Sequence, residues 1–363
     1  MTHLTSVNYY IVIIMYIAPV FPAGSRGWIS VTTRLLSPLD IGPRTLQNRI
    51  ILTPLIPSSP QPSPPCYVQC VGAGLVIAQG APVCPEGLGH IDATGLYSAE
   101  QVAAWKAVTH TLHETGSLVV AQLWHVGRVS HCSLQPSNRA PLAPSGIRTR
   151  SKVFIRDDQG AGIWAPAASP REMTLADIRL AQQAFVDAAA NAMTAGFDLV
   201  ELHGASGYLI EQFLATGTNL RQDDYGGSLE NRARFLLEIV DSLIATLGAE
   251  RVGVRLSPWG SLNDIEDREP HAMALYLAEE LNHRHIAYLH VVEWMPGTGP
   301  AYPEGFRRWL RAAFKNPLIV CANFDSEINE RLLLEGLADA IALTTPLSLC
   351  AYGSKTIEVA TWI

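Results

Sequence analysis

The sequence predicts a (β/α)8 barrel, and two observations support this prediction. Eight short apolar runs recur along the chain, and segments with helical periodicity separate most of them. The runs are almost continuously apolar, which is typical of strands buried on both faces of a parallel sheet. The runner-up is an open doubly wound sheet. We prefer the barrel because eight strand signals are present and no G-x-G-x-x-G motif follows the first of them.

Most of the elements can be placed in order along the chain. The eight candidate strands cover residues 49–55, 74–80, 117–124, 198–203, 252–257, 287–292, 318–323 and 339–344. Three helices between them have clear ends. Segment 98–116 opens with a serine cap and closes with glycine, and segment 228–248 repeats this design. Segment 174–196 begins at Thr174 and carries Asp177 at its third helical position.

Three connections depart from the regular pattern. Link 56–73 holds five prolines and cannot form a long regular helix. After the eighth strand only 19 residues remain, which leaves little room for a final helix. About fifty residues rich in Pro, Ser and Gly, 125–173, follow the third strand. Because barrel active sites form at the carboxyl ends of the strands, we expect this insertion to cap the site.

Composition excludes several classes of protein. The chain has 363 residues, of which 48% are hydrophobic, so it can bury a large core. Its formal charge is −7 and no Lys/Arg cluster is present, which argues against a nucleic-acid or membrane partner. The six cysteines show no paired spacing. Cys66 and Cys70 lack a second pair or nearby histidines, so we predict no metal site and free thiols in the cytoplasm.

The first 33 residues stand apart from the predicted barrel. Residues 9–21 form an apolar run of 13, which is too short to span a bilayer as a helix. A signal peptide over 9–23 is the alternative, although no Lys or Arg precedes the run. We leave residues 1–33 as an unassigned extension and assign 34–363 to the barrel.

Several stretches of the sequence resemble one enzyme family. "ELHGASGYLIEQFL", "TNLRQDDYGGSLENRARFLLEIVD" and "VGVRLSPWG" are similar to the old yellow enzymes, the FMN-dependent ene-reductases. "LLSPLDIGPRTLQNRI", "AQLWHVGR" and "CANF" extend the likeness from about residue 35 to residue 346. The resemblance implies a barrel with FMN at its carboxyl-end mouth. It also implies that hydride passes from NAD(P)H to the flavin and then to the β-carbon of an enone.

The resemblance assigns roles to individual residues. It makes His203 a ligand of the substrate carbonyl oxygen, places Ser206 as the second ligand, and makes Tyr208 the proton donor to the α-carbon. The implied flavin contacts are Pro54, Gly80, Gln122, Arg255 and Asn323.

The residues themselves agree with a site in the mouth of the barrel. His203 ends a predicted strand, and donors aimed at a carbonyl oxygen stabilise enolate character. The alternatives are a packed core histidine for His203, a rim aromatic for Tyr208 and a packing role for Ser206. Arg255 lies within a buried strand and needs a partner there, either a flavin or an acidic residue such as Glu201.

Most departures from the family fall at positions that contact the flavin in the family. Thr344 and Thr345 replace a Gly-Arg pair that clamps the FMN phosphate in the family. Ala322 replaces a glycine beside Asn323, where a Cβ would hinder approach to a phosphate. Ile56 replaces a threonine that hydrogen-bonds the flavin ring, Ser206 is shorter than the family's Asn or His, and the family's long C-terminal segment is missing.

These departures lead to three hypotheses. The first is weak or absent FMN and a redox-neutral epimerisation or isomerisation of a bulky, apolar carbonyl compound in natural-product biosynthesis. The second is an FMN-dependent ene-reductase of an α,β-unsaturated carbonyl that uses NAD(P)H. The third is a non-catalytic relic that binds a metabolite.

Overall fold

The protein forms a closed barrel of parallel strands, as the sequence predicts. The computed structural model describes residues 34–53, 67, 72–91, 93–293, 302–321 and 326–343. Eight parallel strands run in the order β3, β4, β6, β11, β12, β13, β14 and β15. The circuit closes because β15 pairs with β3 and β6 pairs with β11. An open doubly wound sheet is therefore excluded, since such a sheet would have two free edges.

Each predicted apolar run coincides with one barrel strand to within a few residues at either end. The strands are β3 (Ile50–Leu52), β4 (Leu75–Ile77), β6 (Leu118–Trp124), β11 (Leu199–Gly204), β12 (Val252–Leu256), β13 (Tyr288–Val292), β14 (Leu318–Cys321) and β15 (Ala340–Leu343). The helices around them are α2 (Ala99–Glu114), α3 (Leu175–Thr194), α5 (Leu229–Leu247), α6 (Pro270–His283), α7 (Phe306–Ala313) and α8 (Ser326–Leu334). A short helix, α4 (Leu209–Leu214), directly follows the loop after β11.

The helix starts follow from their capping residues. The Ser98 side chain accepts the Gln101 N–H, and the Gln101 side chain accepts the Ser98 N–H in return. Thr174 and Asp177 form the same reciprocal pair at α3. Each pair satisfies two backbone donors that the first helical turn leaves unpaired. The predicted starts of these two helices are therefore confirmed.

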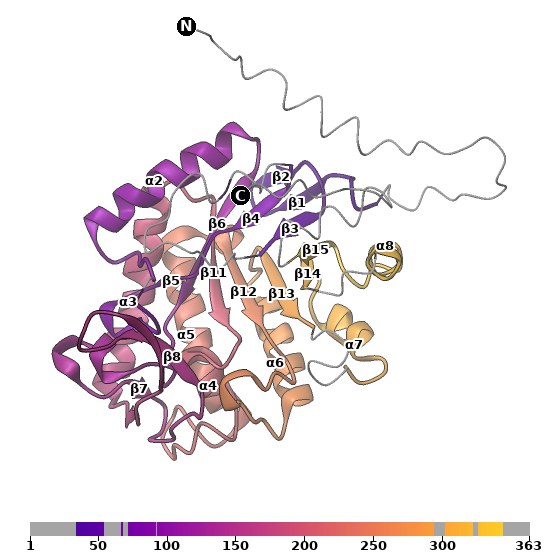
Figure 1. Ribbon diagram of the computed structural model, residues 1–363. Helices are drawn as coiled ribbons and strands as arrows, with labels where there is room; N and C mark the ends of the chain where they lie inside the picture. The colour runs from indigo at the N-terminus through magenta and orange to yellow at the C-terminus, as the bar shows by residue number, and fades with distance from the viewer. Residues whose placement is uncertain are drawn as a thin grey trace, which may run out of the picture.

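A two-stranded hairpin closes the amino-terminal end of the barrel. Strands β1 (Leu39–Ile41) and β2 (Arg44–Leu46) pair antiparallel. Ile41 and Leu46 are buried in the apolar cluster that fills the barrel interior. In Figure 1 the arrows of β11, β12 and β13 point away from this hairpin and toward β8 and α4. The chemistry must therefore use the other, carboxyl-terminal end.

The insertion after β6 is an ordered structure. Its strands are β7 (Leu142–Ala143), β8 (Lys152–Arg156), β9 (Gly162–Pro166) and β10 (Arg171–Glu172). Strands β8 and β9 form an antiparallel hairpin, and short β5 (Ala81–Pro82) pairs with the end of β6. Val153 and Ile155 of β8 belong to a small hydrophobic cluster that packs against Trp124 and Tyr208. The insertion therefore covers these two rings at the mouth.

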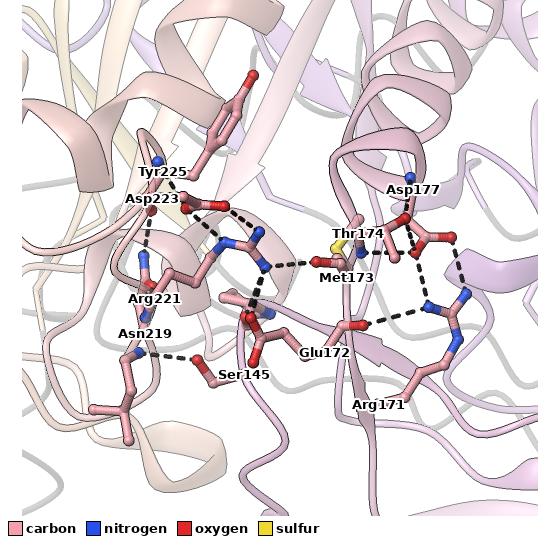
Figure 2. A network of polar contacts seen from close by, with 12 residues as sticks. Ser145, Arg171, Glu172, Met173, Thr174, Asp177, Asn219, Arg221, Asp223 and Tyr225 are labelled. Carbon is pink, nitrogen blue, oxygen red and sulfur yellow. Dashed lines mark hydrogen bonds and ion pairs between the residues drawn. The ribbon is translucent and has the colours of Figure 1, made fainter.

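Arg221 fastens the insertion to the loop that precedes α5 (Figure 2). Its guanidinium donates to the carbonyl oxygens of Pro144 (3.1 Å) and Met173 (2.6 Å) in the insertion. It also donates to both carboxylate oxygens of Asp223 on its own loop. The side chain is only 5% exposed. The buried Arg221 guanidinium therefore joins the two segments through hydrogen bonds to both.

Replacing Arg221 by alanine should lower the free energy of unfolding by about 2 kcal/mol, because charge-assisted hydrogen bonds to two segments are lost. Urea unfolding followed by circular dichroism measures this loss. Arg171→Ala is the matched control, since the Arg171 side chain is 43% exposed and its pair with Asp177 lies at the surface. It should cost less than about 1 kcal/mol. Equal losses in the two variants would show that Arg221 has no special anchoring role.

Candidate active site

The candidate site is built on four adjacent strands at the barrel mouth. Strand pairing places Gln122 of β6 beside Glu201 of β11, and His203 of β11 beside Arg255 of β12. Arg255 in turn lies beside His290 of β13. Side chains on alternate positions of a strand point to the same face. The polar residues therefore form a continuous layer inside the barrel, below its mouth.

The rings of Tyr208 and Trp124 meet the His203 ring at the edge of this layer. The centroid of the Tyr208 ring lies 5.1 Å from that of His203, and the two planes are perpendicular at 90°. Trp124, at the end of β6, lies 5.1 Å from Tyr208 and 6.0 Å from His203. Tyr208 is the residue just before α4, so a three-residue loop separates it from the end of β11. The structure thus brings together the two residues that the sequence singled out.

Glu201 is the hub of the polar layer. Its Oε1 accepts a hydrogen bond from Gln122 Nε2 (2.7 Å), and its Oε2 accepts one from the Tyr288 hydroxyl (3.1 Å). His290 Nδ1 lies 3.0 Å from the same Oε2. Burial lowers the pKa of His290, so the ring is neutral and donates through Nδ1. Burial opposes ionisation of Glu201, but His290, Arg255 and Gln122 outweigh it and lower the pKa of this carboxyl.

Sequence analysis missed Tyr288, His290 and Trp124. A signal for the first two was present, because they occupy alternate positions of "AYLHVV" and so share one face of the strand. The charge of Arg255 acts on Glu201, one of the two partners expected for it, and the flavin alternative stays a prediction. The Glu201 oxygens are taken by the three donors named above, and Arg255 Nε is buried with no hydrogen-bond partner among the described residues.

Several other buried nitrogens at the mouth also have no partner within the described part of the chain. They are Trp124 Nε1, His203 Nδ1 and His290 Nε2. A buried polar atom without a partner costs about 1–3 kcal/mol, so such atoms point to a bound polar group. A flavin ring fits this requirement because its edge carries carbonyl oxygens and ring nitrogens. Arg255 and Gln122, two of the predicted flavin contacts, would hold it.

Protonation states at the mouth are fixed by burial and by Arg255. Burial, and next the charge of Arg255, hold the pKa of His203 well below its ordinary value, so the imidazole is neutral at pH 7. Burial raises the pKa of Tyr208 to about 12, so its phenol keeps its proton. The pair therefore offers a neutral N–H donor and a neutral acid.

Ser206 takes a strained backbone conformation between these two residues. Its φ is +61°, a region that favours glycine. Its N–H donates to Ser257 Oγ (3.1 Å), and its carbonyl accepts from Asn263 Nδ2 (2.8 Å). Both contacts involve the backbone, so the assignment of its hydroxyl as a second carbonyl ligand stays a prediction. The assignments to Pro54, Ile56, Ala322, Asn323, Thr344 and Thr345 lie outside the described residues.

Gly80 is required at the mouth by close packing. A Cβ at this position would lie 2.7 Å from the Trp124 ring and 3.1 Å from Gln122 Oε1. Gly80→Ala should therefore displace the indole, cost about 1–3 kcal/mol of stability and weaken substrate binding. Thermal unfolding and the quenching of tryptophan fluorescence by a bound enone measure the two effects. Gly116→Ala is unsuitable as a control because its φ is +79°, whereas Gly146 has only a contact at 3.7 Å and provides a matched control.

The fold and the mouth together define a class of protein, a barrel oxidoreductase with a flavin-type site. The family description "NADH:flavin oxidoreductase / NADH oxidase family" matches residues 34–347. The chain therefore belongs to this family, the old yellow enzymes, and the resemblance seen in the sequence is confirmed.

Named relatives agree with this placement. The chain is 36% identical over 322 residues to "Putative 12-oxophytodienoate reductase 2" of Oryza sativa subsp. japonica, covering 85% of this chain and 82% of the relative. It is 37% identical over 318 residues to "12-oxophytodienoate reductase 2" of Arabidopsis thaliana, covering 85% and 84%. The solved structure of morphinone reductase aligns with a TM-score of 0.82 at 42% identity, covering 85% of this chain and 84% of its own.

Two kinds of feature are absent from the described residues. They contain no group of three or more His, Cys, Asp or Glu side chains arranged to hold a metal ion. They also contain no helix that combines the length and the apolar character needed to cross a bilayer.

Proposed function

We propose that this protein is an FMN-dependent ene-reductase that uses NAD(P)H to reduce the double bond of an α,β-unsaturated carbonyl compound. The observation that supports this proposal is the set of unpartnered nitrogens beside the His203–Tyr208 pair. These atoms call for a bound polar group, and a flavin held by Gln122 and Arg255 would offer carbonyl acceptors for the N–H donors and a ring N–H for His290 Nε2. The names of the relatives point the same way, since they are reductases.

Each residue at the mouth has a definite task in this reaction. When bound, FMN would supply the hydride that adds to the β-carbon. His203 donates a hydrogen bond to the substrate carbonyl oxygen as a neutral imidazole, which stabilises the enolate that forms. Tyr208 then gives its phenolic proton to the α-carbon. Trp124 and the hydrophobic cluster around Val153 and Ile155 provide an apolar wall, which suits a bulky, apolar substrate.

A redox-neutral epimerisation or isomerisation is the second candidate, and the replacement of the phosphate-clamping pair by Thr344 and Thr345 favours it. This reaction needs a base beside the α-carbon. With a pKa of about 12, only about one Tyr208 side chain in 10⁵ is ionised at pH 7. The lowered pKa of His203 makes the imidazole a weak base as well. The protonation states therefore favour the reductase.

Absorbance spectroscopy and turnover in D₂O separate the candidates. For the reductase, the protein should bind added FMN and show a flavin spectrum, and it should oxidise NAD(P)H only when an enone such as 2-cyclohexenone is present. Protein that holds no FMN, but exchanges the α-proton of a ketone for deuterium without a nicotinamide, would instead establish the redox-neutral reaction. If neither activity appears across a panel of enones and ketones, the relic hypothesis gains support.

A further inference from the structure

The loop between β11 and α4 is held in an unusual backbone conformation. Ser206 and Gly207 both have positive φ values, +61° and +76°. A Cβ at Gly207 would lie 2.5 Å from the carbonyl oxygen of Leu262, so this position needs glycine. The loop aims Tyr208 at His203, whose ring centroid is 5.1 Å away. Whatever holds these residues therefore sets the geometry of the proton donor.

Glu211, in the first turn of α4, holds the loop through two routes. One carboxylate oxygen accepts the N–H of Gly207 directly. The other accepts the hydroxyl of Ser257 (2.6 Å), and Ser257 Oγ in turn accepts the N–H of Ser206 (3.1 Å). Glu211 and Ser257 are 7% and 4% exposed, so water does not compete strongly for these bonds. Both residues line a pocket whose lining does not include His203, Tyr208 or Trp124.

We propose that Glu211 is a positioning residue for the proposed reduction, because its carboxylate fixes the Ser206–Gly207–Tyr208 loop against His203 and holds it more weakly when protonated. Only the expected effect of Glu211 on catalysis rests on the proposed function. The effect on the loop does not depend on any bound group.

The charge of Glu211 matters because both of its partners are donors. An ionised carboxylate accepts from Gly207 and Ser257 at once, and charge-assisted hydrogen bonds are about twice as strong as neutral ones. If the carboxylate oxygen that faces Ser257 were protonated, the Ser257 hydroxyl could no longer donate to it. The carboxyl O–H would then donate to Ser257 Oγ instead. The bond from Gly207 would remain but would lose its charge assistance. Protonation thus weakens both routes without breaking the fold.

The surroundings of Glu211 place its titration in the neutral range. Burial has the largest effect and raises the pKa of Glu211, and the negative charge of Asp267 raises it further. Hydrogen bonds from Ser257 and Gly207, and the positive charge of Arg255, lower it. Together these effects raise the pKa of Glu211 to about 7. Glu266 also lines the pocket in front of Glu211. A second support for the loop does not titrate, because Gln212 Nε2 donates to the carbonyl oxygens of Gly207 (2.7 Å) and Val126 (3.0 Å).

The first arm of the test is the pH dependence of kcat/KM for enone reduction between pH 5.5 and 9. The wild type should gain about ten-fold as pH rises through the titration of Glu211. Glu211→Gln has one acceptor and one donor group, like the protonated carboxyl, so it should stay near the low value with no step. Glu266→Gln removes an exposed carboxylate from the same pocket and should keep the wild-type profile. A step that persists in Glu211→Gln would overturn the proposal.

The second arm measures amide hydrogen exchange in the full-length protein and needs no activity. At pH 8 the Gly207 amide should exchange about ten-fold faster in Glu211→Gln than in wild type or Glu266→Gln. The difference should disappear below pH 6. If Glu211→Gln does not fold, Ser257→Ala replaces it and should speed exchange at Ser206. Unchanged exchange refutes the positioning role whatever the activity. Faster exchange in a protein without reductase activity supports that role and refutes the proposed function instead.

Discussion

Tyr208→Phe is expected to lower kcat for enone reduction by a factor of about 10²–10⁴, the usual contribution of a positioned general acid. The change removes one oxygen and keeps the ring that packs against Trp124 and His203. The carbonyl site and the wall of the pocket should therefore survive, and KM should change little. A loss of kcat with an unchanged KM is the result of removing an interaction made mainly in the transition state.

NAD(P)H consumption with saturating enone measures this effect, and Tyr276→Phe on α6 is the matched control with an expected loss of less than two-fold. The pH profile adds a second check. Because burial raises the pKa of Tyr208 to about 12, the phenol remains an acid through pH 10, and its ionisation should not reduce the rate there. Full kcat in Tyr208→Phe would assign the proton to another donor, such as water.

Glu201→Ala is expected to lower the free energy of unfolding by about 3–5 kcal/mol, as when one partner of a buried charged pair is removed. The change leaves the Gln122 amide, the Tyr288 hydroxyl and the His290 ring without their shared acceptor. Arg255 also loses the nearest negative charge in the layer. FMN affinity should fall in parallel, because Gln122 is no longer held in place and Arg255 loses its compensating charge.

Urea unfolding and FMN titration measure the two losses separately. Glu279→Ala, on the exposed face of α6, controls for the loss of a carboxylate and should change stability by less than about 0.5 kcal/mol. Glu201→Gln keeps the volume and one acceptor oxygen, so its cost should lie between these values. A stability loss in Glu201→Ala no larger than that of the control would show that the polar layer does not depend on Glu201.

The positions of the elements could be predicted because local chemistry determines them. Ser98, Thr174 and Ser228 cap their helices through side chains that are visible in the sequence, and the observed helices begin at the next residue in each case. The strands could be found because most of their residues are apolar. This same property hides which face points inward, and so "AYLHVV" did not reveal that Tyr288 and His290 face the barrel interior.

The partners within the site could not be predicted because they depend on strand register. Sequence analysis paired Arg255 with Glu201 as one alternative, since both are charged and lie in buried strands. Register sets Arg255 directly beside His203 and His290, and Glu201 directly beside Gln122, so Arg255 acts on Glu201 through charge while the hydrogen bonds of Glu201 go to other residues. One residue of shift in the pairing would change every neighbour, and nothing in a single strand specifies that shift. The insertion was expected as a cap, but its β8–β9 hairpin, with Phe154 opposite Trp164, was not foreseen.

The hairpin of β1 and β2 determines where the smallest autonomous folding unit can begin. Ile41 and Leu46 belong to the same buried cluster as Leu75, Val120 and Leu199, so a chain shortened to start at the first barrel strand would expose part of this cluster to water. A deletion series should therefore remain soluble when it begins near residue 34 and precipitate once it removes residues 39–46.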